Sequence, residues 1–197
     1  MSDENFPHLN DSNSTTALVE GDNSYSYAEL NQRIDKFATG LLNGKNDLEE
    51  ERVAFFIPAS IEYVTTMHGI WRAGGIAIPL NVASAVAELE HYLSCASVTR
   101  MIANGEYQES LREICAQLDI ELVGVEDVMA EEVGNLPTIL PERRAMILFT
   151  SGTTNKPKGV VSTHKTIRAQ ITTLVEAWNW TDQDCIPLFL PVHHIHG

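Results

Sequence analysis

The chain has 197 residues, of which 44% are hydrophobic and 20% are charged. These proportions are typical of a folded globular domain and exclude a collagen, a disulfide-stapled scaffold and a disordered chain. The 13 basic and 27 acidic residues give a formal net charge of -14, which argues against nucleic acid as a partner.

The N-terminal residues 1–15 are acidic and polar, and we expect them to be disordered or extended. A secretory or transit peptide would be basic at this position. No stretch of the chain reaches the roughly 18 to 20 apolar residues that a membrane-spanning helix needs, so we expect no integral membrane segment. The three cysteines form no CxxC pair, and their odd number suits a reducing compartment. These features predict a cytoplasmic location.

From residue 17 to residue 125, strand-like apolar runs alternate with helical segments. Strands are predicted at 17–21, 23–27, 53–58, 76–81, 98–104 and 121–125, and helices at 27–43, 61–73, 86–97 and 106–118. Ser26 and Glu29 have the spacing of a capping box at the start of the first helix. Strands separated by helices predict an α/β fold, with a mainly parallel sheet and helices on both faces.

The character of the sequence changes after residue 125. Residues 126–142 lose periodicity and gain acidic residues and prolines, which predicts a surface connection. A strand at 144–150 leads into a polar segment, SGTTNKPKG, at 151–159. We then expect a strand-like run, an amphipathic helix at 164–178 capped by Ser162 or Thr163, and a last strand at 185–191.

One segment of this acidic chain is cationic. Six of the 13 basic residues lie between residues 143 and 168, where no Asp or Glu occurs. They are Arg143, Arg144, Lys156, Lys158, Lys165 and Arg168. Two interpretations remain open: chance clustering on a solvated face, and a site for an anion.

The polar segment at 151–159 has the composition of a phosphate site. Its glycines allow backbone N–H groups to approach a ligand, its hydroxyl groups are hydrogen-bond donors, and Lys158 adds a positive charge. The order Lys158-Gly159 differs from that of a nucleotide P-loop, in which glycine precedes the lysine. The alternative is a polar surface loop between two strands.

The run LFTSGTTNKPKGVVSTH resembles the phosphate-binding signature of the adenylate-forming superfamily, which includes acyl-CoA synthetases, luciferases and the adenylation domains of peptide synthetases. SYSYAELNQRIDKFATGLL, RVAFFIPASIEYVTTMHGIWRAGGIAIPLN and LFLPVHHIHG are similar to other segments of these enzymes. The resemblance covers residues 16–197 and is greatest to the malonyl-CoA synthetase branch. It implies that these residues are the N-terminal part of the large domain of such an enzyme.

The resemblance implies an acid–thiol ligase that works in two steps. A small carboxylic acid attacks the α-phosphate of ATP to give an acyl-adenylate and pyrophosphate, and the thiol of coenzyme A then displaces AMP. ATP, Mg²⁺ and coenzyme A are the expected cofactors, and fatty acid metabolism is the expected setting. Three alternatives remain: an inactive phosphate-binding or regulatory module, a peptide-synthetase adenylation domain, and an unrelated α/β anion-binding protein.

The resemblance also implies which residues act. The residues expected to bind ATP are Thr150, Ser151, Gly152, Thr153, Thr154, Lys158 and Gly159. Lys158 and His194 are the expected catalytic residues, and His194 matches a histidine near the acyl and pantetheine channel. We expect no metal site, because histidines at positions 193, 194 and 196 cannot all face one ion from a regular strand.

The later motifs of the family have no counterpart before Gly197. They are the adenine-binding motif, the acidic magnesium ligand, the ribose-binding aspartate and the C-terminal catalytic lysine. We therefore expect the chain to be truncated, to lack the C-terminal portion of the enzyme and to be inactive by itself. Which carboxylic acid is used and how many chains assemble are not indicated by the sequence.

Overall fold

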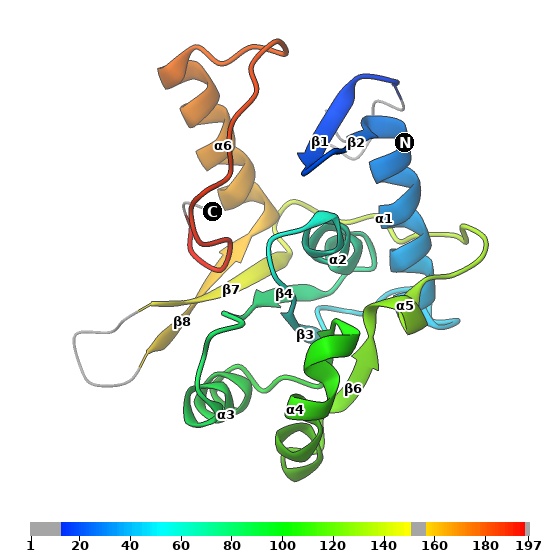
Figure 1. The fold of residues 1–197 in the computed structure, drawn as a ribbon, viewed down its shortest axis with the longest axis vertical. Helices are drawn as coiled ribbons and strands as arrows, with labels where there is room; N and C mark the ends of the chain where they lie inside the picture. The colour runs from blue at the N-terminus through cyan, green and yellow to red at the C-terminus, as the bar shows by residue number, and fades with distance from the viewer. Residues whose placement is uncertain (1–12, 151–156, 196–197) are drawn as a thin grey trace.

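A computed structural model describes residues 13–150 and 157–195 of the chain, so most of the predicted N-terminal segment 1–15 lies outside it. The strands of the main sheet are β3 (Arg52–Phe56), β4 (Ile76–Pro79), β5 (Arg100–Ala103), β6 (Glu121–Gly124), β7 (Arg144–Thr150) and β8 (Lys158–Thr163). Their order is β6-β5-β3-β4-β7-β8, with β8 antiparallel at one edge and the other neighbours parallel. The predicted α/β fold with a mainly parallel sheet is therefore confirmed (Figure 1).

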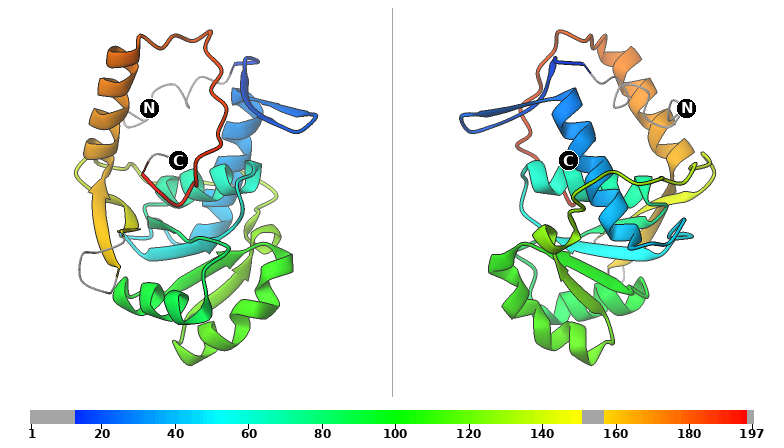
Figure 2. Two further views of the ribbon diagram at one scale, coloured as in Figure 1. Left: turned by 60° about the vertical axis from the view of Figure 1, so that its left-hand side comes forward. Right: turned by 90° about the vertical axis from the view of Figure 1, so that its right-hand side faces the viewer.

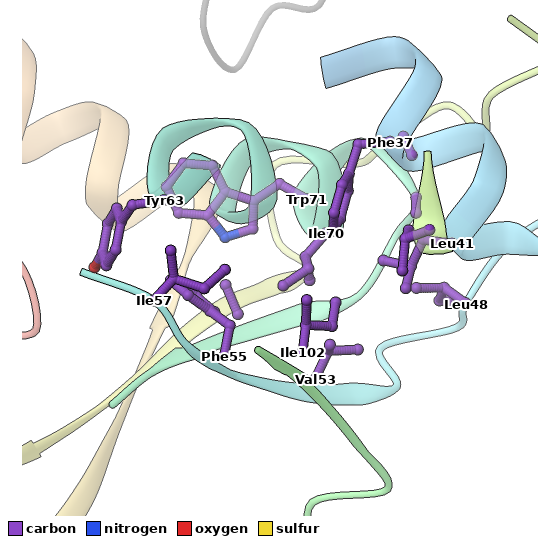
Figure 3. Packing of buried hydrophobic residues seen from close by; sticks show 14 of the residues in the cluster. Phe37, Leu41, Leu48, Val53, Phe55, Ile57, Tyr63, Ile70, Trp71 and Ile102 are labelled. Atoms are coloured by element: carbon purple, nitrogen blue, oxygen red, sulfur yellow. The ribbon is translucent and has the colours of Figure 1, made fainter. Parts of the chain in front are cut away.

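The two faces of the sheet are covered by different helices. The helices are α1 (Tyr27–Leu42), α2 (Ile61–Arg72), α3 (Val86–Cys95), α4 (Gly105–Gln117), α5 (Val125–Val128) and α6 (His164–Trp178). Side chains alternate along β3, so that Val53 and Phe55 pack with α1 and α2, whereas Ala54 and Phe56 pack with α3 and α4. Figure 3 shows Ile70 and Trp71 of α2 lying over the β3 side chains of the first face.

The first helix and the two strands before it form as the sequence predicts. β1 (Thr16–Glu20) and β2 (Asn23–Ser26) pair antiparallel in a separate two-stranded sheet. The hydroxyl of Ser26 accepts a hydrogen bond from the backbone N–H of Glu29, and the Glu29 carboxylate accepts one from the backbone N–H of Ser26. These contacts complete the capping box and hold the pKa of Glu29 below its ordinary value.

Close packing of α1 against α2 depends on a glycine. A Cβ atom at Gly69 would lie 2.4 Å from a ring carbon of Phe37, which is closer than atoms can approach. Both residues are buried. Helix α2 is apolar on most of its faces because it lies between α1 and the sheet.

The connection predicted at 126–142 contains one element that the sequence does not indicate. Val125 and Val128 are buried and form the short helix α5 against α1. A Cβ atom at Gly40 of α1 would lie 1.6 Å from the backbone oxygen of Val128. The loss of periodicity hid this element, because one turn of helix is too short to show a repeat.

The strand predicted at 185–191 is wrong. No strand of the described residues pairs with this segment, which returns from the end of α6 toward the sheet in extended form (Figure 2). Its side chains are accordingly exposed, with Phe189 at 81%. An apolar run resembles a buried strand in sequence, but a strand forms only where a neighbour accepts its hydrogen bonds.

Helix α6 begins as predicted, but its apolar face is not buried. Thr163 is the N-cap, and its hydroxyl accepts a hydrogen bond from the backbone N–H of Thr166. Ile171 and Trp178 are 46% and 60% exposed. The ring of Trp178 contacts Trp180, at 4.9 Å between ring centroids. An amphipathic pattern thus located the helix correctly without giving its degree of burial.

Two basic residues of the cationic segment form ion pairs at the amino end of β7. Arg143 donates two hydrogen bonds to the Asp47 carboxylate, at 2.6 and 2.9 Å, and a third to the backbone oxygen of Gly74. Arg144 is paired with Glu50. These two arginines therefore stabilise the start of the strand, at the opposite end from the predicted phosphate segment.

We predict that the Arg143–Asp47 pair makes stability depend on pH. Hydrogen bonds from Arg143 hold the pKa of Asp47 below its ordinary value of 3.8. A carboxyl group whose pKa is lowered by folding stabilises the folded state at pH values above its ordinary pKa. This contribution is lost as the pH falls from the ordinary pKa toward the lower pKa of the folded protein. Asp47→Asn should lower the free energy of unfolding by about 1 kcal/mol at neutral pH.

Urea denaturation at neutral pH and at about pH 3 measures this difference. The loss caused by Asp47→Asn should shrink at the lower pH. Glu109→Gln is the control, because the Glu109–Arg112 pair is solvent-exposed and its removal should change stability by at most a few tenths of a kcal/mol. An equal loss from Asp47→Asn at both pH values would show that packing, rather than charge, is responsible.

Candidate functional site

The ladder between β7 and β8 ends where the predicted phosphate segment begins. Thr150 pairs with Lys158, and the hydroxyl of Thr150 donates a hydrogen bond to the backbone oxygen of Lys158 at 3.5 Å. Lys158 and Gly159 therefore belong to β8, which corrects the expectation that the loop continues to residue 159. Ser151, Gly152, Thr153 and Thr154 lie outside the described residues.

Lys158 is exposed at the end of this hairpin, which extends from the edge of the sheet (Figure 1). Among the described residues, no carboxylate lies within ion-pair distance of its ammonium group. It differs in this respect from Arg143, Arg144 and Lys165, which are all paired with acidic residues. Its charge is thus available to an anionic ligand.

A cavity of about 260 Å³ lies at the carboxyl ends of β4 and β7. It is lined by Pro79, Leu80, Asn81, Ser84, Glu88, Tyr92, Phe149, Thr150, Pro157, His193 and His194. Two residues singled out from the sequence, Thr150 and His194, therefore share one cavity, and Lys158 directly follows its lining residue Pro157. The carboxyl ends of parallel strands are the usual place for ligands in such sheets.

The segment that carries His194 is attached to α2. The phenol of Tyr63 donates a hydrogen bond to the backbone oxygen of Val192 at 2.7 Å. Burial raises the pKa of Tyr63, so its hydroxyl remains a donor over the physiological range. The backbone N–H of His194 donates to the oxygen of Pro191 at 3.0 Å. These bonds set the position of the 191–194 turn over the sheet.

Two histidine rings meet at this turn. The centroids of His193 and His194 are 4.4 Å apart. Burial, and then the neighbouring His194, hold the pKa of His193 below its ordinary value. His193 is therefore neutral at physiological pH and offers the cavity one ring donor and one ring acceptor.

The amino end of α3 supplies the polar residues that the sequence did not indicate. Glu88 accepts a hydrogen bond from the backbone N–H of Ala85, and burial, followed by the charge of Glu88, raises the pKa of Tyr92. The Asn81 side chain accepts a hydrogen bond from Ala83. The position of Asn81, two residues after the end of the parallel strand β4, was an available signal, since such positions line ligand sites.

A second cavity, of about 300 Å³, adjoins the first and shares Leu80, Asn81 and His193 with it. Its remaining lining comes from the stretch after β3, from Val82 and from residues 188–192. In the described part of the chain, no group of three or more His, Cys, Asp or Glu side chains is arranged to hold a metal ion. No helix there has the length and apolar character required to cross a membrane.

The chain is similar to known proteins in both sequence and structure. The family described as AMP-binding enzyme matches residues 8–197. The mitochondrial malonate–CoA ligase ACSF3 of Homo sapiens is 36% identical in an alignment 196 residues long, which covers 92% of this chain and 33% of that protein. The malonate–CoA ligase of Arabidopsis thaliana is 29% identical, over 98% of this chain and 36% of that protein. The chain thus spans about a third of the length of these curated relatives.

The structural comparison agrees with the sequence comparison. The ATP-bound MatB of Rhodopseudomonas palustris superposes with a TM-score of 0.87 and 26% identity, over 100% of this chain and 42% of that one. The o-succinylbenzoate CoA synthetase MenE of Bacillus subtilis, solved with an acyl-adenylate, has a TM-score of 0.82 at 22% identity and shows the shared fold.

Proposed function

The chain belongs to the AMP-binding enzyme family, and we propose that it is the N-terminal part of an ATP-dependent acid–thiol ligase that acts on malonate. The cavity that joins Thr150 at the end of β7 to His194 is the observation that supports this proposal most directly. Residues from both sequence motifs of the predicted ligase line this one space, which supports the proposal. The similarity to malonate–CoA ligases supports the choice of acid.

In the proposed reaction, each part of the site has a separate task. Thr150, the 151–154 segment and Lys158 bind the phosphates of ATP, and Lys158 offsets the charge that grows on pyrophosphate as the bond to the α-phosphate breaks. We assign His194, which lines the same cavity, to the acyl group and the thiol of coenzyme A. Adenylation and thioester formation follow in that order.

Magnesium fits the donors of this cavity. Ser84, Glu88 and Thr150 offer oxygen atoms, which are the ligands that Mg²⁺ prefers, and ATP phosphates and water supply the rest. When bound, the ion neutralises phosphate charge.

The proposed domain is residues 16–197 as part of a larger adenylate-forming domain. Fatty acid metabolism and a cytoplasmic location remain predictions, and the human relative offers mitochondria as another location.

The test is acid-dependent release of pyrophosphate and formation of a CoA thioester. An enzyme that carries this chain together with the rest of the family's length should use malonate better than acetate or octanoate. The 197-residue chain alone should release no pyrophosphate with any of them, because the family's adenine pocket and C-terminal lysine have no counterpart in it. Turnover by the chain alone would contradict the second expectation. Preference for an amino acid would point to a peptide-synthetase domain instead.

A further inference from the structure

His91 of α3 contacts the base of the phosphate segment from outside the cavity. Its Nε2 atom lies 2.8 Å from the backbone oxygen of Pro157, 66 residues further along the chain. The ring is half-buried and is not part of the cavity lining. His91 therefore contacts the residue that directly precedes β8, and it does not line the cavity in which a ligand would lie.

The accepting oxygen belongs to the peptide group that leads into Lys158. The last pair of the β7–β8 ladder is Thr150 with Lys158, so Pro157 lies just beyond the ladder. Proline has no N–H, and its carbonyl is the one backbone group through which it can be hydrogen-bonded. Because the peptide group is planar, a bond that fixes this oxygen also fixes the direction in which the chain enters Lys158.

The same histidine contacts the opposite strand. Its ring lies edge-on to Phe149, at 6.5 Å between centroids, and Phe149 directly precedes Thr150. Tyr92 packs closely on Phe149 as well, at 4.5 Å. His91 and Tyr92 of α3 thus contact the end of β7, and His91 also makes a polar contact with Pro157, which directly precedes β8.

We propose that His91 is a positioning residue, which holds the Pro157–Lys158 peptide so that the lysine ammonium meets the phosphates of ATP. The inference rests on the proposed adenylation function. A carbonyl oxygen only accepts hydrogen bonds, so Nε2 of His91 carries the proton and Nδ1 is not needed for this role. Substitutions that keep or remove a hydrogen-bond donor at the position of Nε2 can therefore test this role.

The test compares three variants in the enzyme that contains this chain. His91→Ala removes the donor and should slow pyrophosphate formation about three- to tenfold, the effect of one hydrogen bond. His91→Gln has an amide nitrogen at the position of Nε2 and should retain most of the rate. His91→Asn has its amide nitrogen nearer the backbone, at the position of Nδ1, and should resemble alanine. Thioester formation from supplied malonyl-adenylate should be unchanged in all three.

A double-mutant cycle with Lys158→Ala shows whether His91 acts through the lysine. Removing His91 should cost much less in the Lys158→Ala background than in the wild type. Additive losses, equal rates for glutamine and asparagine, or equal slowing of both half-reactions would overturn the proposal. If the wild-type enzyme forms no pyrophosphate with any acid, the proposed function itself fails, and that outcome is distinct from an active wild type with unaffected His91 variants.

The contact can also be tested without turnover. Hydrogen exchange of the purified chain should be faster in His91→Ala than in His91→Gln over peptides that cover residues 157–161, while α4 is unchanged. Equal exchange in the two variants would show that the bond to Pro157 does not hold this strand end.

Discussion

Lys158→Ala is expected to slow adenylation by about tenfold to a few hundredfold, because a charge-assisted contact contributes roughly 1.5 to 3 kcal/mol and 1.4 kcal/mol corresponds to one decade. Lys158 is exposed beside the cavity, with no acidic partner among the described residues. The effect should appear in pyrophosphate release from ATP and malonate. Thioester formation from supplied malonyl-adenylate should change little, because no pyrophosphate is present in that step.

Lys165→Ala is a matched control for the loss of one positive charge. Its ammonium lies 3.8 Å from Glu142, and both side chains are exposed, so its removal should leave both half-reactions within about twofold of the wild type. Equal slowing of the two half-reactions by Lys158→Ala would mean that the lysine serves the fold or general nucleotide affinity. The phosphate role assigned to it would then be wrong.

Phe55→Ala is expected to destabilise the protein by about 3 to 5 kcal/mol, the usual cost of removing a large core aromatic side chain. Phe55 is fully buried on β3 and contacts the ring of Tyr63, at 5.0 Å between centroids (Figure 3). Alanine would leave a cavity between α2 and the sheet. Such a loss is large against the total of about 5 to 15 kcal/mol that is typical of a domain. Urea denaturation followed by circular dichroism measures it.

Phe189→Ala makes the same chemical change at an exposed position. Its side chain is 81% exposed, so its removal should alter the free energy of unfolding by no more than about 0.5 kcal/mol. Comparable losses from the two variants would contradict the assignment of the core to the α2 face of β3. The comparison also tests whether residues 185–191 pack with any other part of the chain.

The 185–191 segment shows why apolar composition does not by itself determine a strand. Its run of apolar residues is similar to that of β3, and the two segments have different environments. β3 lies between β4 and β5 and is buried on both faces, whereas the later segment has no neighbouring strand among the described residues. Backbone hydrogen bonds across a sheet come from distant parts of the chain, so no local pattern could show whether they exist.

The sequence analysis did not predict the cavity residues Glu88 and Tyr92, for a related reason. The loop signature identified Thr150 and Lys158, because glycines, hydroxyl groups and lysine act together over a few consecutive residues. Glu88 and Tyr92 carry no such signature. They line the cavity because α3 lies beside the end of β7, where Tyr92 packs on Phe149, and this contact is a property of the folded chain.

The sequence by itself determined the features that depend on near neighbours. The alternating periods set the order of strands and helices, Ser26 and Thr163 set two helix starts, and the signature at 150–159 predicts a phosphate-binding segment. The tertiary structure alone decided which distant groups meet: Arg143 with Asp47, His91 with Pro157, and Tyr63 with Val192. Caps and periods act over three or four residues, whereas these contacts form only after the sheet brings strand ends and helices together.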